Sequence, residues 1–300
     1  MTGSIRIGQR TVSVTHGERM IFSASDITKA EIVEHYRRVA RHMLPHVRGR
    51  PVMMQRFPGS GDSPAIYQKA IPSHFPEWIH RVTVEKVGGT VTHVVCDDAA
   101  SLVYLANQGC ITPHVWLSRV EHLDRPDRMI IDLDPGEGGA ADARFAAAAA
   151  RELLTDAGLV PHLMATGSRG YHVVVPLRPS EAFEEVRAVA FGLAEALARR
   201  APDRLTTEFH KKNRGGRLFL DCNRNAYAQT AVPVYAVRPK PAAPVAVPLA
   251  WDELETSEPD GWNVRTIAQR LEQVPDPWLG FGRHARSLDP ARRWLAREQR

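Results

Sequence analysis

The sequence predicts a mixed α/β or α+β protein, because the middle of the chain alternates strand-like and helix-like segments. An apolar run at residues 128–135, RMIIDLDP, reads as a buried strand, and an alanine-rich helical run follows it to Leu159. Two more strand-like runs span 159–166 and 170–177, and residues 180–200 have helical periodicity. Segments mixed in this order are typical of an α/β or α+β catalytic core.

The elements before this core are predicted from capping and periodicity. A helix over residues 28–46 begins with Thr28 and Glu31, which fit a capping box, and its apolar residues then repeat at helical spacing. Short strands are expected at 51–57 and 65–69, on either side of the turn-rich stretch PGSGDSP. The first part of the chain therefore also mixes helix and strand.

The remaining elements are placed by their end signals. A helix over 99–108 is capped by one of two preceding aspartates and stops at a glycine. The run GGRLFLD at 215–221 predicts a strand, and YAVRP at 235–239 is a candidate for another. The Pro/Ala-rich stretch 239–248 is expected to be a spacer without regular structure. The tail from 276 onward ends in a basic, partly amphipathic segment.

Composition sets limits on the class of protein. The 300 residues are 43% hydrophobic and 24% charged, as in ordinary globular proteins, and no apolar run approaches the ~20 residues needed to cross a bilayer. The start of the chain lacks signal-peptide features, so we expect a cytoplasmic protein without membrane contact. Cys96, Cys110 and Cys222 are far apart and indicate neither disulfides nor a zinc site. The formal charge of +5 suits a polyanionic partner.

An acidic pair ends the central strand. Asp132 and Asp134 stand two residues apart, so in a strand both side chains project from one face while Ile131 and Leu133 turn to the other. Two neighbouring carboxylates need cations or must bind protons. A pair of divalent ions would satisfy them and could serve a phosphoryl transfer. The alternative is that Asp134 only begins an Asp-Pro-Gly turn and Asp132 is an exposed edge residue.

Asp221 repeats this pattern at the end of the apolar run RLFLD. Three arginines lie near it in the sequence: Arg214, Arg217 and Arg224. A local ion pair with one of them explains the carboxylate equally well. The combination of a third strand-end carboxylate with arginines also meets the needs of a site for a metal ion and a triphosphate.

The segment between the runs 159–166 and 170–177 is rich in glycine and hydroxyl groups. It reads Thr166-Gly-Ser168-Arg169-Gly-Tyr-His172, in which backbone N–H groups, hydroxyls and a guanidinium could approach a phosphate. The segment lacks the spacing of a P-loop, and a plain hairpin turn is the competing interpretation. Three further candidates, His114, Arg238 and Lys240, could equally be solvated residues.

Taken together and in this order, these segments resemble one family. The chain resembles the primase-polymerase domain of bacterial DNA ligase D and its stand-alone relatives, members of the archaeo-eukaryotic primase superfamily. The resemblance extends from about residue 10 to about residue 275. The segments that carry it are ITKAEIVEHYRRVARHMLPHVRGRP, IYQKAIP, HVWLSR, IIDLDPGEG, ATGSRGYHVVVPL, GGRLFLDCNRN and RPKPAAPVAVPLAWDEL.

The resemblance implies an archaeo-eukaryotic primase fold, in which an RRM-like catalytic module packs on a second α/β module and a cleft lies between them. We expect the N-terminal α/β module at 1–120, the RRM-like module at 121–250 and a C-terminal helical extension at 251–300. The implied reaction transfers a nucleotide from an NTP or dNTP to a 3′-hydroxyl. Ribonucleotides and Mn²⁺, or Mg²⁺ in its place, are the preferences that the family suggests.

Roles for individual residues also follow from the resemblance. Asp132, Asp134 and Asp221 match the positions that hold two metal ions and carry catalysis. Arg19 and Lys29 match positions that hold a DNA 5′-phosphate, and Tyr67 is expected to stack on a template base. The positions that match nucleotide contacts are His114, Thr166, Ser168, Arg169, His172, Arg214, Arg238 and Lys240.

The chain departs from the family pattern at several places. Gln55 stands where relatives usually have a lysine, Ile66 and Tyr67 replace paired phenylalanines, and Cys222 begins a pair that is more often aromatic. These changes indicate altered handling of DNA ends more than lost chemistry. They suit a stand-alone protein as well as a ligase D segment.

The expected partner is DNA with gaps, breaks or 5′-phosphorylated ends, bound by a monomer in the bacterial nucleoid. A DNA-end-binding protein and a ligase are further partners that the family suggests. A competing hypothesis is a non-catalytic module that binds and bridges DNA ends, for which basic charge and a phosphate pocket would suffice. Three carboxylates at a DNA site favour the enzyme, because without metal they would repel phosphate.

Overall fold

The apolar run at 128–134, which contains Asp132 and Asp134, forms a central strand of a six-stranded sheet in the computed structural model. The structure describes residues 3–59 and 64–298. The strand order is β13-β14-β10-β12-β11-β16, and every pair is antiparallel except β13 with β14. The strands are β10 (Arg128–Asp134), β11 (His162–Ala165), β12 (Tyr171–Pro176), β13 (Leu205–Thr206), β14 (Leu218–Asp221) and β16 (Val247–Leu249).

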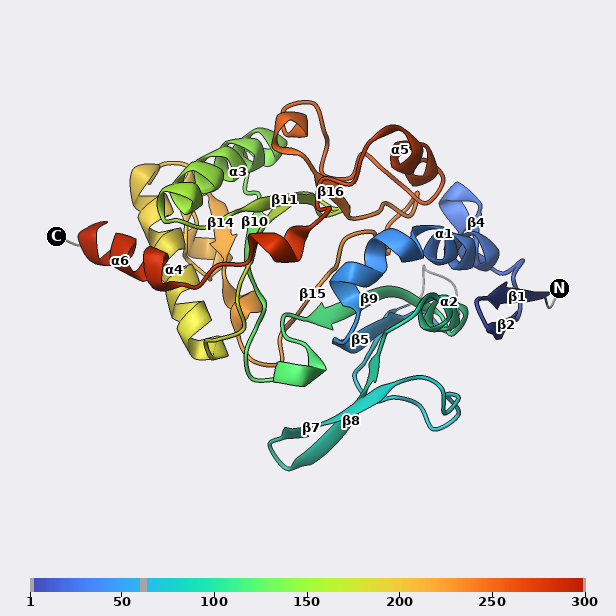
Figure 1. Ribbon diagram of the computed structural model, residues 1–300. Coiled ribbons are helices and arrows are strands. Elements are labelled where there is room, and N and C mark those ends of the chain that lie inside the picture. The colour runs from blue at the N-terminus through green and yellow to red at the C-terminus, as the bar shows by residue number, and fades with distance from the viewer. Residues whose placement is uncertain (1–2, 60–63, 299–300) are drawn as a thin grey trace. The chain divides into compact units, whose positions relative to one another are not determined.

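Two helices, α3 (Gly139–Asp156) and α4 (Phe183–Arg200), pack against one face of this sheet (Figure 1). Ile131 and Leu133 of β10 are buried, as the alternation of the strand requires. The inner face of α3 is lined by alanines, which allow the helix to approach the sheet closely. A last helix, α6 (Asp289–Glu298), packs on α4. The opposite face of the sheet is therefore the one that carries the strand-end carboxylates.

A second sheet has the order β15-β9-β5-β8-β7, with β6 beside β5. Its strands are β5 (Pro51–Arg56), β6 (Ile66–Gln68), β7 (Arg81–Lys86), β8 (Gly89–Val95), β9 (Cys110–Trp116) and β15 (Thr230–Ala231). Two small antiparallel pairs are β1 (Gly3–Ile7) with β2 (Arg10–Val14) and β3 (Met20–Phe22) with β4 (Ile27–Thr28). The helices beside them are α1 (Lys29–Val47), α2 (Ala99–Asn107) and α5 (Ile267–Gln273).

The two sheets belong to different compact units. Unit 1 comprises Met1–Trp116, Thr230–Ala246 and Trp262–Pro275, and unit 2 comprises Leu117–Gln229, Val247–Gly261 and Asp276–Arg300. Short 3-10 helices occur at Ser23–Ser25, Val120–His122, Lys211–Asn213, Asn223–Asn225, Trp251–Glu253 and Phe281–His284. The sub-modules expected at 1–120, 121–250 and 251–300 stay a prediction. No helix in the described part of the chain is long and apolar enough to span a membrane.

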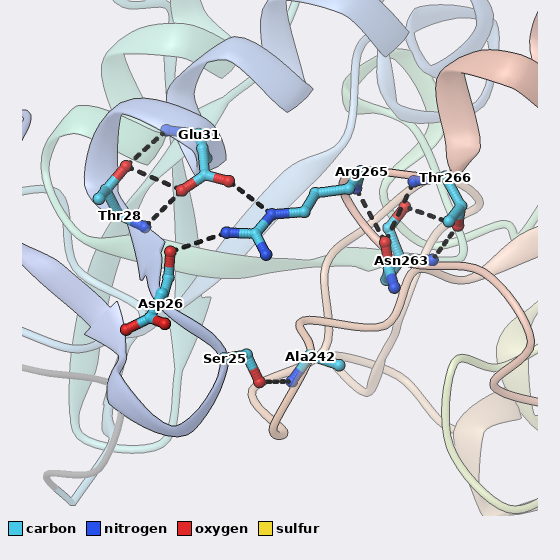
Figure 2. Close-up of polar contacts among 8 residues, drawn as sticks. All are labelled: Ser25, Asp26, Thr28, Glu31, Ala242, Asn263, Arg265 and Thr266. Atoms are coloured by element: carbon cyan, nitrogen blue, oxygen red, sulfur yellow. Dashed lines mark hydrogen bonds and ion pairs between the residues drawn. The ribbon is translucent and has the colours of Figure 1, made fainter.

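The start of α1 is held by polar contacts between distant parts of unit 1 (Figure 2). The side chains of Thr28 and Glu31 form the predicted capping box. Arg265 donates from Nε to Glu31 at 2.8 Å and from its terminal nitrogen to the Asp26 carbonyl at 2.7 Å. One carboxylate therefore caps the helix and also binds the segment before α5.

The structure confirms the mixed α+β class and the helices and strands of the predicted core. One prediction is wrong. Residues 235–239 form only an isolated bridge, Val237 to Val245, because Tyr235 has a positive φ of 66° that interrupts extended structure. The expected spacer 239–248 has no helix or strand over residues 239–246, but its last two residues belong to β16, whose residues are buried and pair with β11. Most of the PGSGDSP stretch lies outside the described residues.

Candidate active site

Three side chains form a row across the sheet of unit 2. Asp132 of β10 lies directly opposite Asp221 of β14 on one side and His172 of β12 on the other. Directly opposed residues of antiparallel strands share a face, with Cβ atoms typically about 4.5–5.5 Å apart. Two carboxylates and an imidazole are therefore neighbours on the face of the sheet that α3 and α4 do not cover.

Asp134 lies one step further along the same face, opposite Phe219 of β14. Its two carboxylate oxygens contact two arginines, Arg169 at 3.3 Å and Arg214 at 3.2 Å. The Arg214 guanidinium also lies over the Phe219 ring, 4.0 Å from its centroid. The Arg214 side chain is thus fixed between an aromatic face and a carboxylate.

The other two carboxylates have cations or amides beside them. Asp132 lies 3.5 Å from Nε2 of His172 and 3.9 Å from Nε of Arg224. Asp221 accepts hydrogen bonds from the backbone and side-chain nitrogens of Asn223, at 2.8 and 2.7 Å. Asp132, Asp134 and Asp221 together are called the acidic row. All three carboxylates are partly exposed, so the acidic row is open to a ligand.

Cys222 follows Asp221 but belongs to the opposite side. Its thiol is buried and donates a hydrogen bond to the carbonyl of Ala190 on α4. Burial raises the pKa of the Cys222 thiol, and the charges of Asp221 and Asp132 raise it further. The thiol therefore stays protonated, and Cys222 acts as a packing residue behind the acidic row.

The glycine-rich turn is a tight hairpin between β11 and β12. A Cβ atom on Gly170 would lie 2.0 Å from the Leu133 carbonyl of β10, so only glycine fits there. The Thr166 hydroxyl donates to the Gly170 carbonyl at 2.7 Å and closes the turn. The partly exposed Ser168 and the exposed Arg169 lie at its tip. The segment is therefore a hairpin turn, and the same turn places Arg169 beside Asp134.

Gln55, the departure from the family pattern, links two candidates in unit 1. Its side-chain amide donates to the Tyr67 hydroxyl at 3.0 Å, and its carbonyl oxygen lies 3.2 Å from Nε2 of His114. Gln55 is buried, whereas Tyr67 is 61% exposed. The amide therefore orients the tyrosine hydroxyl and the imidazole together.

Arg238 and Lys240 follow a segment that is attached to β9 of the same unit. The Thr112 hydroxyl of β9 donates to the Val237 carbonyl, and the Arg238 backbone N–H donates to the Pro244 carbonyl at 2.7 Å. Lys240 lies in the turn that follows. His114 is also a residue of β9, so these contacts fix the backbone of the two basic residues relative to the strand that carries His114.

Arg19 and Lys29 are neighbours near the start of α1. The Lys29 backbone N–H donates to the Arg19 carbonyl at 2.8 Å, and Lys29 Nζ donates to the Thr15 carbonyl at 2.6 Å. Burial, with a smaller contribution from the positive charge of Arg19, lowers the pKa of Lys29 to about 8, although the Glu18 carboxylate acts in the opposite direction. An anion beside the pair would offset that repulsion, which is why two buried or half-buried cations suit a phosphate.

The structure brings together six predicted site residues by direct contact or strand pairing: Asp132, Asp134, Asp221, Arg169, His172 and Arg214. Thr166 and Ser168 belong to the adjoining turn. His114, Arg238, Lys240, Arg19, Lys29 and Tyr67 belong to unit 1. Sequence reasoning gave no role to Phe219 and Asn223. The position of Phe219 two residues before Asp221 on an apolar strand was the available signal.

The donor chemistry of the acidic row fits hard divalent cations, which prefer carboxylate oxygens. Across residues 3–59 and 64–298, no group of three or more His, Cys, Asp or Glu side chains is already arranged around a metal position. Guanidinium groups and an imidazole lie against the carboxylates instead. Arg169 approaches Asp134 at 3.3 Å, and Arg224 approaches Asp132 at 3.9 Å.

The fold and the candidate site define an α+β protein in which one sheet face carries an acidic row edged by arginines. A family model described as "LigD, primase-polymerase domain" matches residues 28–278, and the chain belongs to this family. It is similar to a solved structure of the polymerase domain from Mycobacterium tuberculosis ligase D in complex with DNA. The TM-score is 0.86 and the identity 29%, over 93% of this chain and all of the other.

Full-length relatives show the same relationship. The multifunctional non-homologous end joining DNA repair protein LigD of M. tuberculosis is 32% identical over 256 residues, which is 82% of this chain and 34% of the relative. LigD of Pseudomonas aeruginosa is 30% identical over 300 residues, and that of Bacillus subtilis 30% over 273, covering 98% and 89% of this chain and 36% and 43% of the relatives. The chain thus spans about a third to two fifths of the length of the relatives it matches.

Proposed function

We propose that this protein is a DNA-repair polymerase that transfers nucleotides from an NTP or dNTP to a 3′-hydroxyl on a DNA template. The observation that carries this proposal is the acidic row in which Asp132 and Asp221 are cross-strand neighbours and Asp134 contacts two arginines. Membership in the LigD primase-polymerase family supports the same reaction type.

Asp132, Asp134 and Asp221 are the residues that would hold two divalent ions, Mn²⁺ or Mg²⁺. When bound, such ions lower the pKa of an attacking hydroxyl and neutralise charge on a leaving pyrophosphate. The carboxylate oxygens of the three aspartates need this positive charge, because three carboxylates facing nucleic acid repel its phosphates. No side chain of the chain is required as a nucleophile in this proposal.

The basic residues around the row would bind the triphosphate. Arg169 and Arg214 contact Asp134, so both guanidinium groups already lie where an anion next to that carboxylate would be bound. Arginine binds phosphate oxygens in a bidentate manner, and fixed cations stabilise charge that develops during phosphoryl transfer. His172, Thr166 and Ser168 complete the proposed nucleotide contacts in unit 2, and His114, Arg238 and Lys240 those in unit 1.

The DNA substrate we propose has gaps, breaks or 5′-phosphorylated ends. The close pair Arg19 and Lys29 supports a 5′-phosphate site, because burial and the charge of Arg19 disfavour the charged form of Lys29, Glu18 offsets only part of this effect, and a bound anion would favour the charged form. Exposed Tyr67 would stack on a template base. Relatives named as non-homologous end joining DNA repair proteins suggest this repair context. A DNA-end-binding protein and a ligase as partners, and a preference for ribonucleotides, are further parts of the proposal that follow from the family resemblance.

Primer extension with single substitutions tests the reaction. We expect Asp132→Asn and Asp221→Asn to abolish extension of a gapped, 5′-phosphorylated template with Mn²⁺ and labelled nucleotides, a loss of about 10²–10³-fold or more for a residue central to charge stabilisation. DNA affinity should stay within a few-fold. Asp142→Asn, which changes a carboxylate of α3 that pairs with Arg204, serves as the control. Near-normal extension by either site variant would contradict the proposal.

The competing function is a module that only binds and bridges DNA ends. It is favoured by the Arg19 and Lys29 pair alone, which needs no acidic row. In the same assay such a module would bind the gapped template without elongating it, with either Mn²⁺ or Mg²⁺.

A further inference from the structure

A basic loop enters β14 beside the acidic row. Residues 207–217 read TEFHKKNRGGR, and they contain two lysines and two arginines within eleven positions. Lys211 and Lys212 are exposed and make no ion pair within the described residues. Their charges are therefore available to a polyanion, in contrast to Arg214, which is bound to Asp134.

The backbone of this loop is fixed from inside. Arg214 donates to the carbonyls of Glu208 and Phe209, at 3.1 and 2.9 Å, with nitrogens of the same guanidinium that contacts Asp134. The Gly216 carbonyl accepts a hydrogen bond of 2.9 Å from the Glu137 N–H, just beyond β10. The loop is thus tied to the end of the acidic strand at two points.

Phe209 is the residue that this fixed backbone presents to solvent. Its side chain is 62% exposed, and its ring meets the Phe219 ring edge-on at a centroid distance of 6.3 Å. Phe219 in turn lies opposite Asp134 in the sheet and under the Arg214 guanidinium. A chain of contacts therefore connects an exposed aromatic ring to the acidic row, with Phe219 and Arg214 between them.

We propose that Phe209 is a stacking platform for a nucleobase of the bound DNA strand, and that Lys211 and Lys212 bind the phosphates of that strand. This inference rests on the proposed polymerase function. Aromatic rings next to basic residues are the usual means of holding single-stranded nucleic acid, and stacking contributes about 1–3 kcal/mol per base. A solitary exposed phenylalanine alone would mean little; here two free lysines are its neighbours and its backbone is held by a site arginine.

The strand is a better occupant than the free nucleotide. The triphosphate would bind the guanidinium groups that contact Asp134, whereas Lys211 and Lys212 lie outside those contacts and offer separate charges. Successive phosphates of a strand can use such separate charges at the same time. The ring and the lysines therefore match a chain of nucleotides more closely than a single one.

Fluorescence of 2-aminopurine tests the stacking directly, because the base loses fluorescence when an aromatic ring stacks on it. Gapped templates would carry 2-aminopurine at one single-stranded position at a time and be titrated with the 300-residue chain. We expect quenching at one or two adjacent positions with the wild type. Phe209→Leu and Phe209→Ala should lose most of it and bind the strand about 5- to 100-fold more weakly, the equivalent of the stacking energy. Phe209→Trp should retain both.

Controls separate this inference from the polymerase function. Leu279→Ala removes another exposed apolar side chain of unit 2, 84% exposed and outside the loop, and should leave quenching and extension unchanged. Asp132→Asn should stop extension but keep the quenching. Quenching without extension by the wild type would refute the polymerase and leave the platform standing. Equal quenching by Phe209→Leu, or quenching of free 2-aminopurine nucleotide without DNA, would overturn the assignment to a strand.

Discussion

At the scale of single residues, the site combines charges that oppose each other. Asp134 shares its two oxygens between Arg169 and Arg214, and Asp132 lies between His172 and Arg224. Partly exposed ion pairs of this kind contribute little to stability, about 0–1 kcal/mol each. We therefore propose that these ion pairs serve function, by keeping cations and carboxylates in place for a ligand such as a metal-bound triphosphate.

Gln55 supports a prediction at this scale, since it bonds both Tyr67 and His114. Gln55→Leu should lower the free energy of unfolding by about 1–2 kcal/mol, because two hydrogen bonds are lost at a buried position. Tyr67→Phe removes only the hydroxyl and should cost about 0.5–1 kcal/mol. Urea unfolding of both variants and of the double variant gives the coupling. Strictly additive losses would show that the amide does not bind the tyrosine.

At the scale of elements, the hairpin β11–β12 sets the geometry of the acidic row. Its turn brings Arg169 to Asp134, and its register places His172 opposite Asp132. Gly170 allows the turn to lie against β10, where the Leu133 carbonyl fills the space that a Cβ would need. The absence of a side chain at Gly170 therefore allows the close approach of the turn to β10 at the end of the β10–β12 pairing.

Gly170→Ala tests this packing. We expect it to lower the free energy of unfolding by about 2–4 kcal/mol, since a Cβ at 2.0 Å from a carbonyl oxygen forces the strands apart. Gly282→Ala is the matched control: it lies in the same unit, and nothing lies within 4 Å of its added Cβ. The control should change stability by less than about 0.5 kcal/mol. Equal denaturation midpoints for the two variants would refute the close-approach argument.

The elements also show what a sequence can predict. The capping box of α1, the strand β10 and the β11–β12 hairpin follow from local signals, and each was predicted correctly. The strand β16 could not be seen locally, because its partner β11 is more than eighty residues away and its composition is that of a linker. The strand expected at 235–239 was wrong for a different reason. Tyr235 has a positive φ, and its N–H donates a 2.6 Å hydrogen bond to the carbonyl of Ala246, a contact that the local sequence does not reveal.

The candidate site divides in the same way. Alternation along a strand was enough to place Asp132 and Asp134 on one face. The structure then pairs Asp221 of β14 with Asp132, a contact that the sequence suggested only through the similar strand-end position of Asp221. The link from Gln55 to His114 and Tyr67 depends on cross-strand register between β5, β6 and β9, which local patterns do not fix. The roles of individual residues stay predictions until variants are measured.

At the scale of the whole molecule, we expect buried histidines in both units to make stability depend on pH. His162 of unit 2 is buried beside His284, at 3.1 Å between ring nitrogens, and Trp278 and Phe281 lie around it. Burial, with a smaller contribution from the nearby His284, lowers the pKa of His162 to about 4. Burial likewise lowers the pKa of His35, in unit 1, to about 4. The folded protein thus keeps both imidazoles neutral where an unfolded chain would protonate them.

The sign of the effect follows from proton binding. Between the ordinary histidine pKa of 6.5 and about 4, the unfolded chain binds more protons than the folded one. The free energy of unfolding should therefore fall as pH drops from 6.5 toward 4, by up to about 1.4 kcal/mol per pH unit for each histidine. Urea unfolding at pH 7, 6, 5 and 4.5 measures this. His162→Gln should show a shallower fall than the wild type, while the exposed control His74→Gln should keep the wild-type slope. If His162→Gln retained the full slope, the imidazole beside His284 would not be the group that senses the proton.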